Sequence, residues 1–158
     1  MNNMPKSPMP KKGSDINLEI ESLAFGGMGV AKYNGIVVFV KNSIPGQKIT
    51  ARIIKKKGGY LEARPLEVLL KSEDEIVHQC EHFIHCGGCS FQNMDYNKQL
   101  IQKEKQVKDL FVRIGNFNNI KINSIVGCND IYNYRNKMEF TFGNHEWIPE
   151  GKSEKNIN

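Results

Sequence analysis

Hydrophobic and polar positions alternate along the first half of the chain as they do in half-buried strands. Ile16, Leu18 and Ile20 alternate with polar residues, a period of two that places one face of a strand against a core. The run 36–40 is β-branched and aromatic, which favours a buried strand, and Asn34 and Gly35 just before it are typical of a type I′ hairpin turn. The pattern predicts several short strands at close intervals.

A further hairpin is predicted over residues 47–55 and 60–68, joined by Lys56, Lys57, Gly58 and Gly59 at a basic tip. The glycines of residues 26–29 break the chain earlier. No Gly-Lys-Ser/Thr follows them and no helix opens there, so a turn is favoured over a phosphate-binding loop. Together the strands predict a small, closed antiparallel β-barrel over residues 14–70, because closure removes the exposed edges of so short a sheet. Barrels of the OB type present basic grooves to oligonucleotides.

The second half changes to a helical pattern, which makes the predicted fold class α+β. Asp95 can cap a helix whose apolar positions recur at Tyr96, Leu100, Val107, Leu110, Phe111 and Ile114, and Gly115 offers a stop. We expect this apolar stripe to belong to a core and the lysines of the other face to be solvated. Short strands are then predicted around residues 120–125 and 138–142.

Charge is unevenly distributed along the 158 residues, whose net charge is +5. Residues 1–70 hold 11 Lys and Arg against 5 Asp and Glu, whereas residues 71–158 hold 11 against 12. A localised positive surface is typical of a module that binds phosphate, but runs of solvent-exposed lysines with no binding role are also common. Residues 1–13 lack the apolar core of a signal peptide and no later segment approaches the length of a membrane span, so a disordered tail and a cytoplasmic location are expected.

Three of the four cysteines, Cys80, Cys86 and Cys89, lie within ten residues. Thiolates are soft ligands suited to zinc or iron–sulfur clusters, and Gly87 and Gly88 allow a tight turn between two of them. Such sites take four ligands, and Cys128 lies far downstream in an unrelated context. A disulfide framework belongs to secreted chains, and a redox pair normally follows a strand of a βαβ unit. Zinc remains an alternative to an iron–sulfur cluster, because His78, His82 and His85 lie among the cysteines and imidazole is a good zinc ligand.

A second candidate site precedes the last predicted strand. Tyr134, Arg135 and Lys137 combine positive charge with stacking surfaces, which suits an unpaired nucleotide. An ordinary charged strand entry explains the same residues equally well.

The first half resembles a TRAM domain, an RNA-binding β-barrel found on RNA-modifying enzymes. The resemblance covers residues 16–70 and rests on the ordered succession of the glycine-rich stretch 23–31, the hairpin 34–40 and the Pro-Gly turn 44–47. It implies RNA as the partner. The residues that it makes candidates for contacts with the RNA backbone are Lys41, Arg52, Lys55, Lys56 and Lys57.

The second half carries another resemblance, through the Cys-x5-Cys-x2-Cys spacing, Ser90-Phe91-Gln92, the helix and Tyr134-Arg135-Asn136-Lys137. These features resemble the N-terminal half of bacterial class I S-adenosylmethionine-dependent RNA uracil-C5 methyltransferases, of the 23S rRNA uracil-5-methyltransferase type. The resemblance implies that Cys80, Cys86 and Cys89 ligate a four-iron four-sulfur cluster. It also implies that the fourth cysteine comes from beyond this chain and that Cys128 does not take its place.

A departure from that family limits the activity expected of this chain. Nothing after Phe142 supplies a glycine-rich cofactor turn, an acidic ribose-binding residue or a nucleophilic cysteine. We therefore expect a fragment without the Rossmann-like methyltransferase domain, with no catalytic or S-adenosylmethionine-binding residue and inactive by itself. Its parts are a tail (1–13), the TRAM barrel (14–70), a cluster segment (71–93), the start of an α+β central domain (94–142) and a polar tail (143–158).

Two functions follow from these expectations. The first is the RNA-binding, iron–sulfur portion of an enzyme that modifies rRNA or tRNA, whose partners are RNA and the missing methyltransferase domain, with neither a membrane nor DNA. The alternative is an autonomous TRAM-type RNA-binding protein whose second domain is stabilised by zinc or a cluster, without catalysis.

Overall fold

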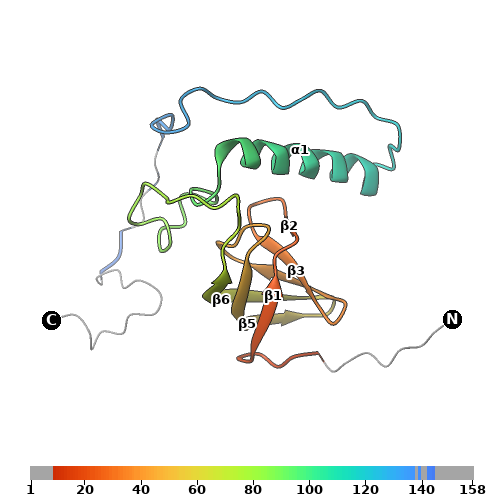
Figure 1. Ribbon diagram of the computed structural model, residues 1–158, viewed down its shortest axis with the longest axis vertical. Coiled ribbons are helices and arrows are strands. Elements are labelled where there is room, and N and C mark those ends of the chain that lie inside the picture. Colours follow the sequence, from red (N-terminus) through yellow and green to blue (C-terminus); the bar gives the residue numbers. More distant parts are fainter. Residues whose placement is uncertain (1–8, 138, 140–141, 145–158) are drawn as a thin grey trace.

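The computed structural model describes residues 9–137, 139 and 142–144, which form one sheet, one helix and long connecting segments (Figure 1). The strands are β1 (Asp15–Glu19), β2 (Ser22–Leu23), β3 (Gly29–Tyr33), β4 (Ile36–Val40), β5 (Lys48–Lys57) and β6 (Tyr60–Leu70), and the helix is α1 (Tyr96–Arg113).

The six strands form a single curled sheet in the order β1-β5-β6-β4-β3-β2. Its two edge strands, β1 and β2, are consecutive in the chain and are separated only by Ile20 and Glu21. The Ile20 N–H donates to the Gln47 carbonyl at 2.9 Å and the Glu21 N–H to the Val30 carbonyl at 2.8 Å, so this connection bonds to both ends of the sheet. The sheet therefore curls until its edges meet.

The expectation of a wholly antiparallel sheet was wrong at one pairing. Strands β4 and β6 run parallel, with Val37 opposite Tyr60 and Val40 opposite Ala63. The long hairpin of β5 and β6 explains this, because β5 carries the chain back across the sheet before β6 returns in the direction of β4. The other four pairings are antiparallel.

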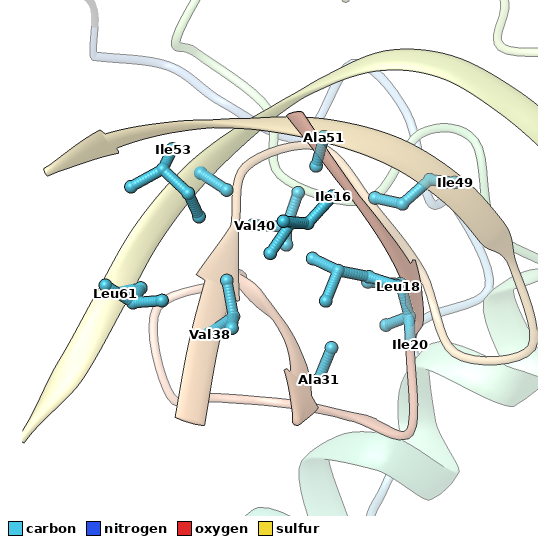
Figure 2. Packing of buried hydrophobic residues seen from close by; sticks show 11 residues of the cluster. Ile16, Leu18, Ile20, Ala31, Val38, Val40, Ile49, Ala51, Ile53 and Leu61 are labelled. Carbon is cyan, nitrogen blue, oxygen red and sulfur yellow. The ribbon is translucent and has the colours of Figure 1, made fainter. Parts of the chain in front are cut away.

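The interior of the curled sheet is the main hydrophobic core. The predicted alternation of β1 is confirmed, because Ile16, Leu18 and the following Ile20 are buried while their polar neighbours face out. Figure 2 shows these side chains pointing toward those of the other strands. The buried cluster consists of Ile16, Leu18, Ile20, Ala31, Val38, Val40, Ile49, Ala51, Ile53, Leu61 and Ala63.

Two predicted turns are present, one of them with shifted limits. Asn34 and Gly35 have φ angles of 50° and 78°, and positive φ at both central positions is the requirement of a type I′ turn between β3 and β4. In the β5–β6 hairpin the turn is confined to Gly58 and Gly59. Lys56 and Lys57, expected in the turn, extend β5 instead, because each pairs with a residue of β6.

Residues 71–95 leave the sheet and fold back on it as a loop (Figure 1). The loop is closed by a bridge between Glu75 and Met94 and by the Ile76 N–H, which donates to the Asn93 carbonyl at 3.0 Å. Met94 is fully buried with Leu23 and Ile44 in a second, smaller hydrophobic cluster. This cluster joins the loop to the sheet.

Helix α1 begins as predicted. The Asp95 side chain accepts a hydrogen bond from the Lys98 N–H at 3.2 Å, and the cap residue Ile114 and Gly115 end the helix through bonds to the Leu110 carbonyl. Nearby, Lys98 Nζ lies 2.8 Å from Asp74 Oδ1, and the hydrogen bond to Asp74 raises the pKa of Lys98.

The expectation that the apolar stripe of α1 lies in a core was wrong. No residue of the helix is buried, and Val107, Leu110 and Phe111 remain about 40% exposed. The helix packs through its glutamines instead. Gln106 Nε2 donates to the Leu23 and Ala24 carbonyls at 3.2 and 3.1 Å, and Gln99 Nε2 donates to the loop carbonyls of Phe91 and Met94 at 3.0 and 2.8 Å.

The segment after α1 runs back along the helix without regular structure (Figure 1). The Cys128 N–H donates to the Tyr96 hydroxyl at 2.8 Å and the Ile125 N–H to Glu104 Oε2 at 3.3 Å. The strand expected around residues 120–125 is therefore absent from this described segment, whose polar groups bond to helix side chains and not to a neighbouring strand. The strand expected at 138–142 falls mostly outside the described residues. Among the described residues no helix combines the length and apolar character that a membrane crossing requires.

Candidate nucleic-acid interface and cysteine segment

The basic end of the β5–β6 hairpin carries three consecutive lysines at the end of β5. Lys55 forms an ion pair with Glu62 at 3.6 Å, and Lys57 Nζ lies 5.6 Å from the centre of the Tyr60 ring. The hydrogen bond between Lys57 and Tyr60 raises the pKa of Lys57. Lys56 has no ion-pair partner in the part of the chain that the structure describes. The hairpin end is therefore exposed and positively charged.

Arg52, another predicted RNA contact, is engaged within the sheet. Its guanidinium bonds to both carboxylate oxygens of Asp15, at 2.7 and 2.8 Å, across the paired strands β1 and β5. These bonds are the main reason that the pKa of Asp15 is lowered and that of Arg52 raised. A bidentate pair of this kind fixes the plane of the guanidinium group. Two of the Arg52 donors are therefore engaged between β1 and β5 and are not free to bind RNA.

The cysteine segment, residues 80–92, lies against the glycine-rich turn between β2 and β3. Asn42 Nδ2 donates to the Ile84 carbonyl at 3.2 Å, and Phe83 is buried. Gly27, with a φ of 95°, approaches so closely that a Cβ on it would lie 2.7 Å from the Ser90 Cβ. The predicted role of the glycines as turn formers is confirmed, and the structure adds that Gly27 is the contact between turn and cysteine segment.

The three clustered cysteines are free thiols on this one segment. Cys86 and Cys89 are exposed and Cys80 is half-buried. Gln92 links two of them, since its Oε1 accepts from the Cys80 N–H at 3.2 Å and its Nε2 donates to the Cys89 Sγ at 3.1 Å. In the described residues no three His, Cys, Asp or Glu side chains are grouped so as to hold a metal ion. The three thiols are therefore chemically suitable ligands for a soft metal, but their sulfur atoms do not point toward a common metal position.

Beside Cys89 lies a hollow of about 720 Å³ that also contains the other predicted stacking site. Tyr134 and Arg135 line it together with Cys89 and Cys128. Lys137, predicted with them, is not among the lining residues and instead forms an ion pair with Glu139 at 3.1 Å. The structure thus brings Tyr134 and Arg135 to the cysteine segment, and it places Cys128 there too, which the sequence did not indicate.

A second hollow, of about 520 Å³, separates the sheet from the cysteine segment. Lys41 lines it from the end of β4 and Arg64 from β6, while His85 and Cys86 line the opposite wall. Arg64 was missed by the sequence reasoning. The sequence predicts a strand over residues 60–68, and only the folded loop shows what Arg64 faces.

Comparison with known protein families supports the resemblance of the first half to a TRAM domain. The sequence profile of the TRAM domain family matches residues 11–66. The solution structure of a conserved protein from Methanococcus maripaludis is 29% identical, with an alignment that covers 42% of this chain and 93% of that one and a TM-score of 0.37.

Most of the chain is similar to longer bacterial proteins. A protein of Halalkalibacterium halodurans named as an uncharacterized RNA methyltransferase is 36% identical over 144 residues, which make up 90% of this chain and 31% of that protein. A protein of Clostridium tetani with the same description is 41% identical over 133 residues, 84% of this chain and 29% of the other. A third, from Porphyromonas gingivalis, is 36% identical over 131 residues, 83% of this chain and 28% of that protein.

The chain therefore spans less than a third of the length of these curated relatives. The TRAM domain family model thus matches residues 11–66 of the β domain, and 83–90% of the chain is similar to part of longer bacterial proteins named as RNA methyltransferases.

Proposed function

We propose that this chain is the RNA-binding, iron–sulfur portion of an S-adenosylmethionine-dependent RNA uracil-C5 methyltransferase that modifies rRNA or tRNA. S-adenosylmethionine and the catalytic groups belong, in this proposal, to the larger part of the relatives' length that the chain does not span. The task of the present residues is to bind the RNA and to stabilise the segment that joins the TRAM domain to the rest of the enzyme.

The observation that carries RNA binding is an exposed basic hairpin on a TRAM domain. Lys55, Lys56 and Lys57 lie in succession at the end of β5, and the TRAM profile covers this hairpin. The curled sheet, whose edges meet at Ile20 and Glu21, fits an OB-type barrel, a fold that offers basic strands and loops to single-stranded nucleic acid. The relatives' shared description as RNA methyltransferases agrees with an RNA ligand.

The cluster assignment is supported by the chemistry of the donors. Cys80, Cys86 and Cys89 are unpaired thiols on a loop anchored at both ends, and thiolates are the usual ligands of iron–sulfur clusters. Gln92 already links the Cys80 backbone to the Cys89 sulfur. A four-iron four-sulfur cluster takes a fourth ligand, which we place outside this chain. When bound, the cluster cross-links the loop, whose few buried side chains stabilise it weakly.

RNA binding can be tested by a triple replacement of Lys55, Lys56 and Lys57 with Ala. Each phosphate contact to a single strand contributes about 0.7 to the slope of log affinity against log salt, so loss of three lowers the slope by about 2. Fluorescence anisotropy with a labelled oligouridine over a salt series measures both affinity and slope. An unchanged affinity and slope would remove this hairpin from the RNA site.

The matched control has the same charge change at a distance from the hairpin. Lys105, Lys108 and Lys121 are all exposed, two of them on α1, where Ala is well tolerated. Their replacement with Ala lowers the net charge equally. If hairpin and control variants lose the same affinity, the effect is one of overall charge and the assignment to the hairpin fails.

A further inference from the structure

The hollow between the sheet and the cysteine segment has the construction of a binding groove. One wall comes from the β domain, through Gly26, Gly27, Lys41 and Arg64, and the other from residues 83–87, 89 and 90. The walls are held together by the Asn42–Ile84 hydrogen bond and by the close packing of Gly27 on Ser90. The groove therefore has fixed walls supplied by two segments that are distant in the sequence.

The groove is positively charged and lacks a counter-charge. Neither Lys41 nor Arg64 forms an ion pair or hydrogen bond through its side chain with any described residue, and no Asp or Glu lines the groove. Arg64 interacts electrostatically with Asp15, whose carboxylate already bonds to Arg52 through both oxygens.

This absence of partners is unusual for the β domain. Most other basic residues of its strands are neutralised by a neighbouring acid, in the pairs Lys32–Glu21, Lys48–Glu19, Arg52–Asp15 and Lys55–Glu62. Two free cations that face one groove are available for an anionic ligand, whereas the paired cations are partly satisfied within the fold.

The turn that supplies Gly26 and Gly27 to the groove also carries an exposed aromatic residue. Phe25 lies in the turn between β2 and β3, directly before the groove residue Gly26, and is 80% exposed. Proteins hold single-stranded nucleic acid by combining exposed aromatic rings, which stack on bases, with unpaired cations, which bind the backbone.

We propose that this groove binds a nucleotide unit of single-stranded RNA, with a phosphate against Lys41 and Arg64 and the base stacked on Phe25. The inference rests on the proposed RNA-binding function and deepens it. It assigns a second contact region, next to the cysteine segment and separate from the lysines of the β5–β6 hairpin. A paired base has no free face for Phe25, so the ligand is single-stranded.

The test uses anisotropy with a labelled oligouridine on the full chain. Phe25→Ala should weaken binding about tenfold with an unchanged salt slope, because stacking is uncharged, and Phe25→Trp should restore it. A Lys41→Ala, Arg64→Ala double variant should lower the slope by about 1.4, for two phosphate contacts. Lys105→Ala, Lys108→Ala is the control with equal charge. The inference is overturned if Phe25→Ala binds like the wild type, or if groove and control variants behave alike.

The same titrations separate the two proposals. If the wild-type chain does not bind the oligouridine, both the RNA-binding function and the groove are overturned. If it binds, and only replacement of the hairpin lysines weakens it, the function stands and the groove is overturned. Phe25, Lys41 and Arg64 are not buried, so their replacement should leave the fold intact, which circular dichroism and the melting temperature can verify.

Discussion

Replacing Gly27 with Ala tests the contact that holds the cysteine segment to the TRAM domain. The φ of Gly27 is 95°, a left-handed conformation, and an added Cβ would lie 2.7 Å from the Ser90 Cβ and 3.2 Å from the Phe91 Cζ. Non-bonded carbons prefer about 3.5–4.0 Å, so the cysteine segment has to move. Gly26 is the matched control, because its φ is 91° and a Cβ there would meet nothing within 4 Å.

Two costs can therefore be separated. The left-handed backbone costs a residue with a Cβ about 1–2 kcal/mol, and this applies equally to Gly26→Ala and Gly27→Ala. Overpacking of a tight contact adds about 1–3 kcal/mol, and this applies to Gly27→Ala alone. We expect Gly26→Ala to lower the free energy of unfolding by about 1–2 kcal/mol and Gly27→Ala by about 2–5 kcal/mol.

Urea unfolding of the two variants measures the difference, and a second replacement identifies its source. Ser90→Gly in the Gly27→Ala background removes the two Ser90 atoms nearest the new Cβ and leaves the Phe91 contact, so it should recover most of the overpacking cost and leave the backbone cost. Limited proteolysis within residues 80–92 should be faster in Gly27→Ala than in Gly26→Ala. Equal stabilities of the two single variants, or no recovery with Ser90→Gly, would refute the reasoning.

Two further predictions concern stability. Phe111→Ala should cost less than about 1 kcal/mol because the side chain is about 40% exposed, whereas Ile49→Ala, fully buried, should cost about 2–5 kcal/mol; equal losses in thermal unfolding would place α1 in a core after all. The hydrogen bond from Arg52 holds the pKa of Asp15 below its ordinary value of 3.8. The ion pair therefore contributes its full stabilisation above pH 3.8, and this contribution is lost as the pH falls through the lowered pKa of Asp15. Asp15→Asn should therefore flatten the acid limb of the stability profile, and an unchanged acid limb would exclude the pair as its source.

Local signals in the sequence predicted the β domain well. The alternation of β1, the type I′ turn at Asn34 and Gly35 and the cap at Asp95 each depend on a few adjacent residues. Such features are set by backbone sterics and by hydrogen bonds within a turn, so a single sequence carries them.

Features that depend on distant partners were missed or wrong. The parallel β4–β6 pairing arises from how the long hairpin closes the sheet, and the approach of Gly27 to Ser90 joins residues 63 positions apart in the sequence. The apolar stripe of α1 has the period of a core helix, but the helix bonds to the sheet through Gln106, so periodicity did not identify the packed face. For the same reason the sequence did not identify Arg64 as a groove residue, because its position there depends on the loop that folds over it.

The most direct test of the proposed function is the metal content of the chain purified without oxygen. The account predicts iron and acid-labile sulfide in near-equal amounts with a visible absorption band, all lost in Cys86→Ser and all retained in Cys128→Ser. Stoichiometric zinc would contradict it and favour an autonomous zinc-stabilised RNA-binding module, and the absence of both metals would contradict the assignment of Cys80, Cys86 and Cys89 as cluster ligands in this chain.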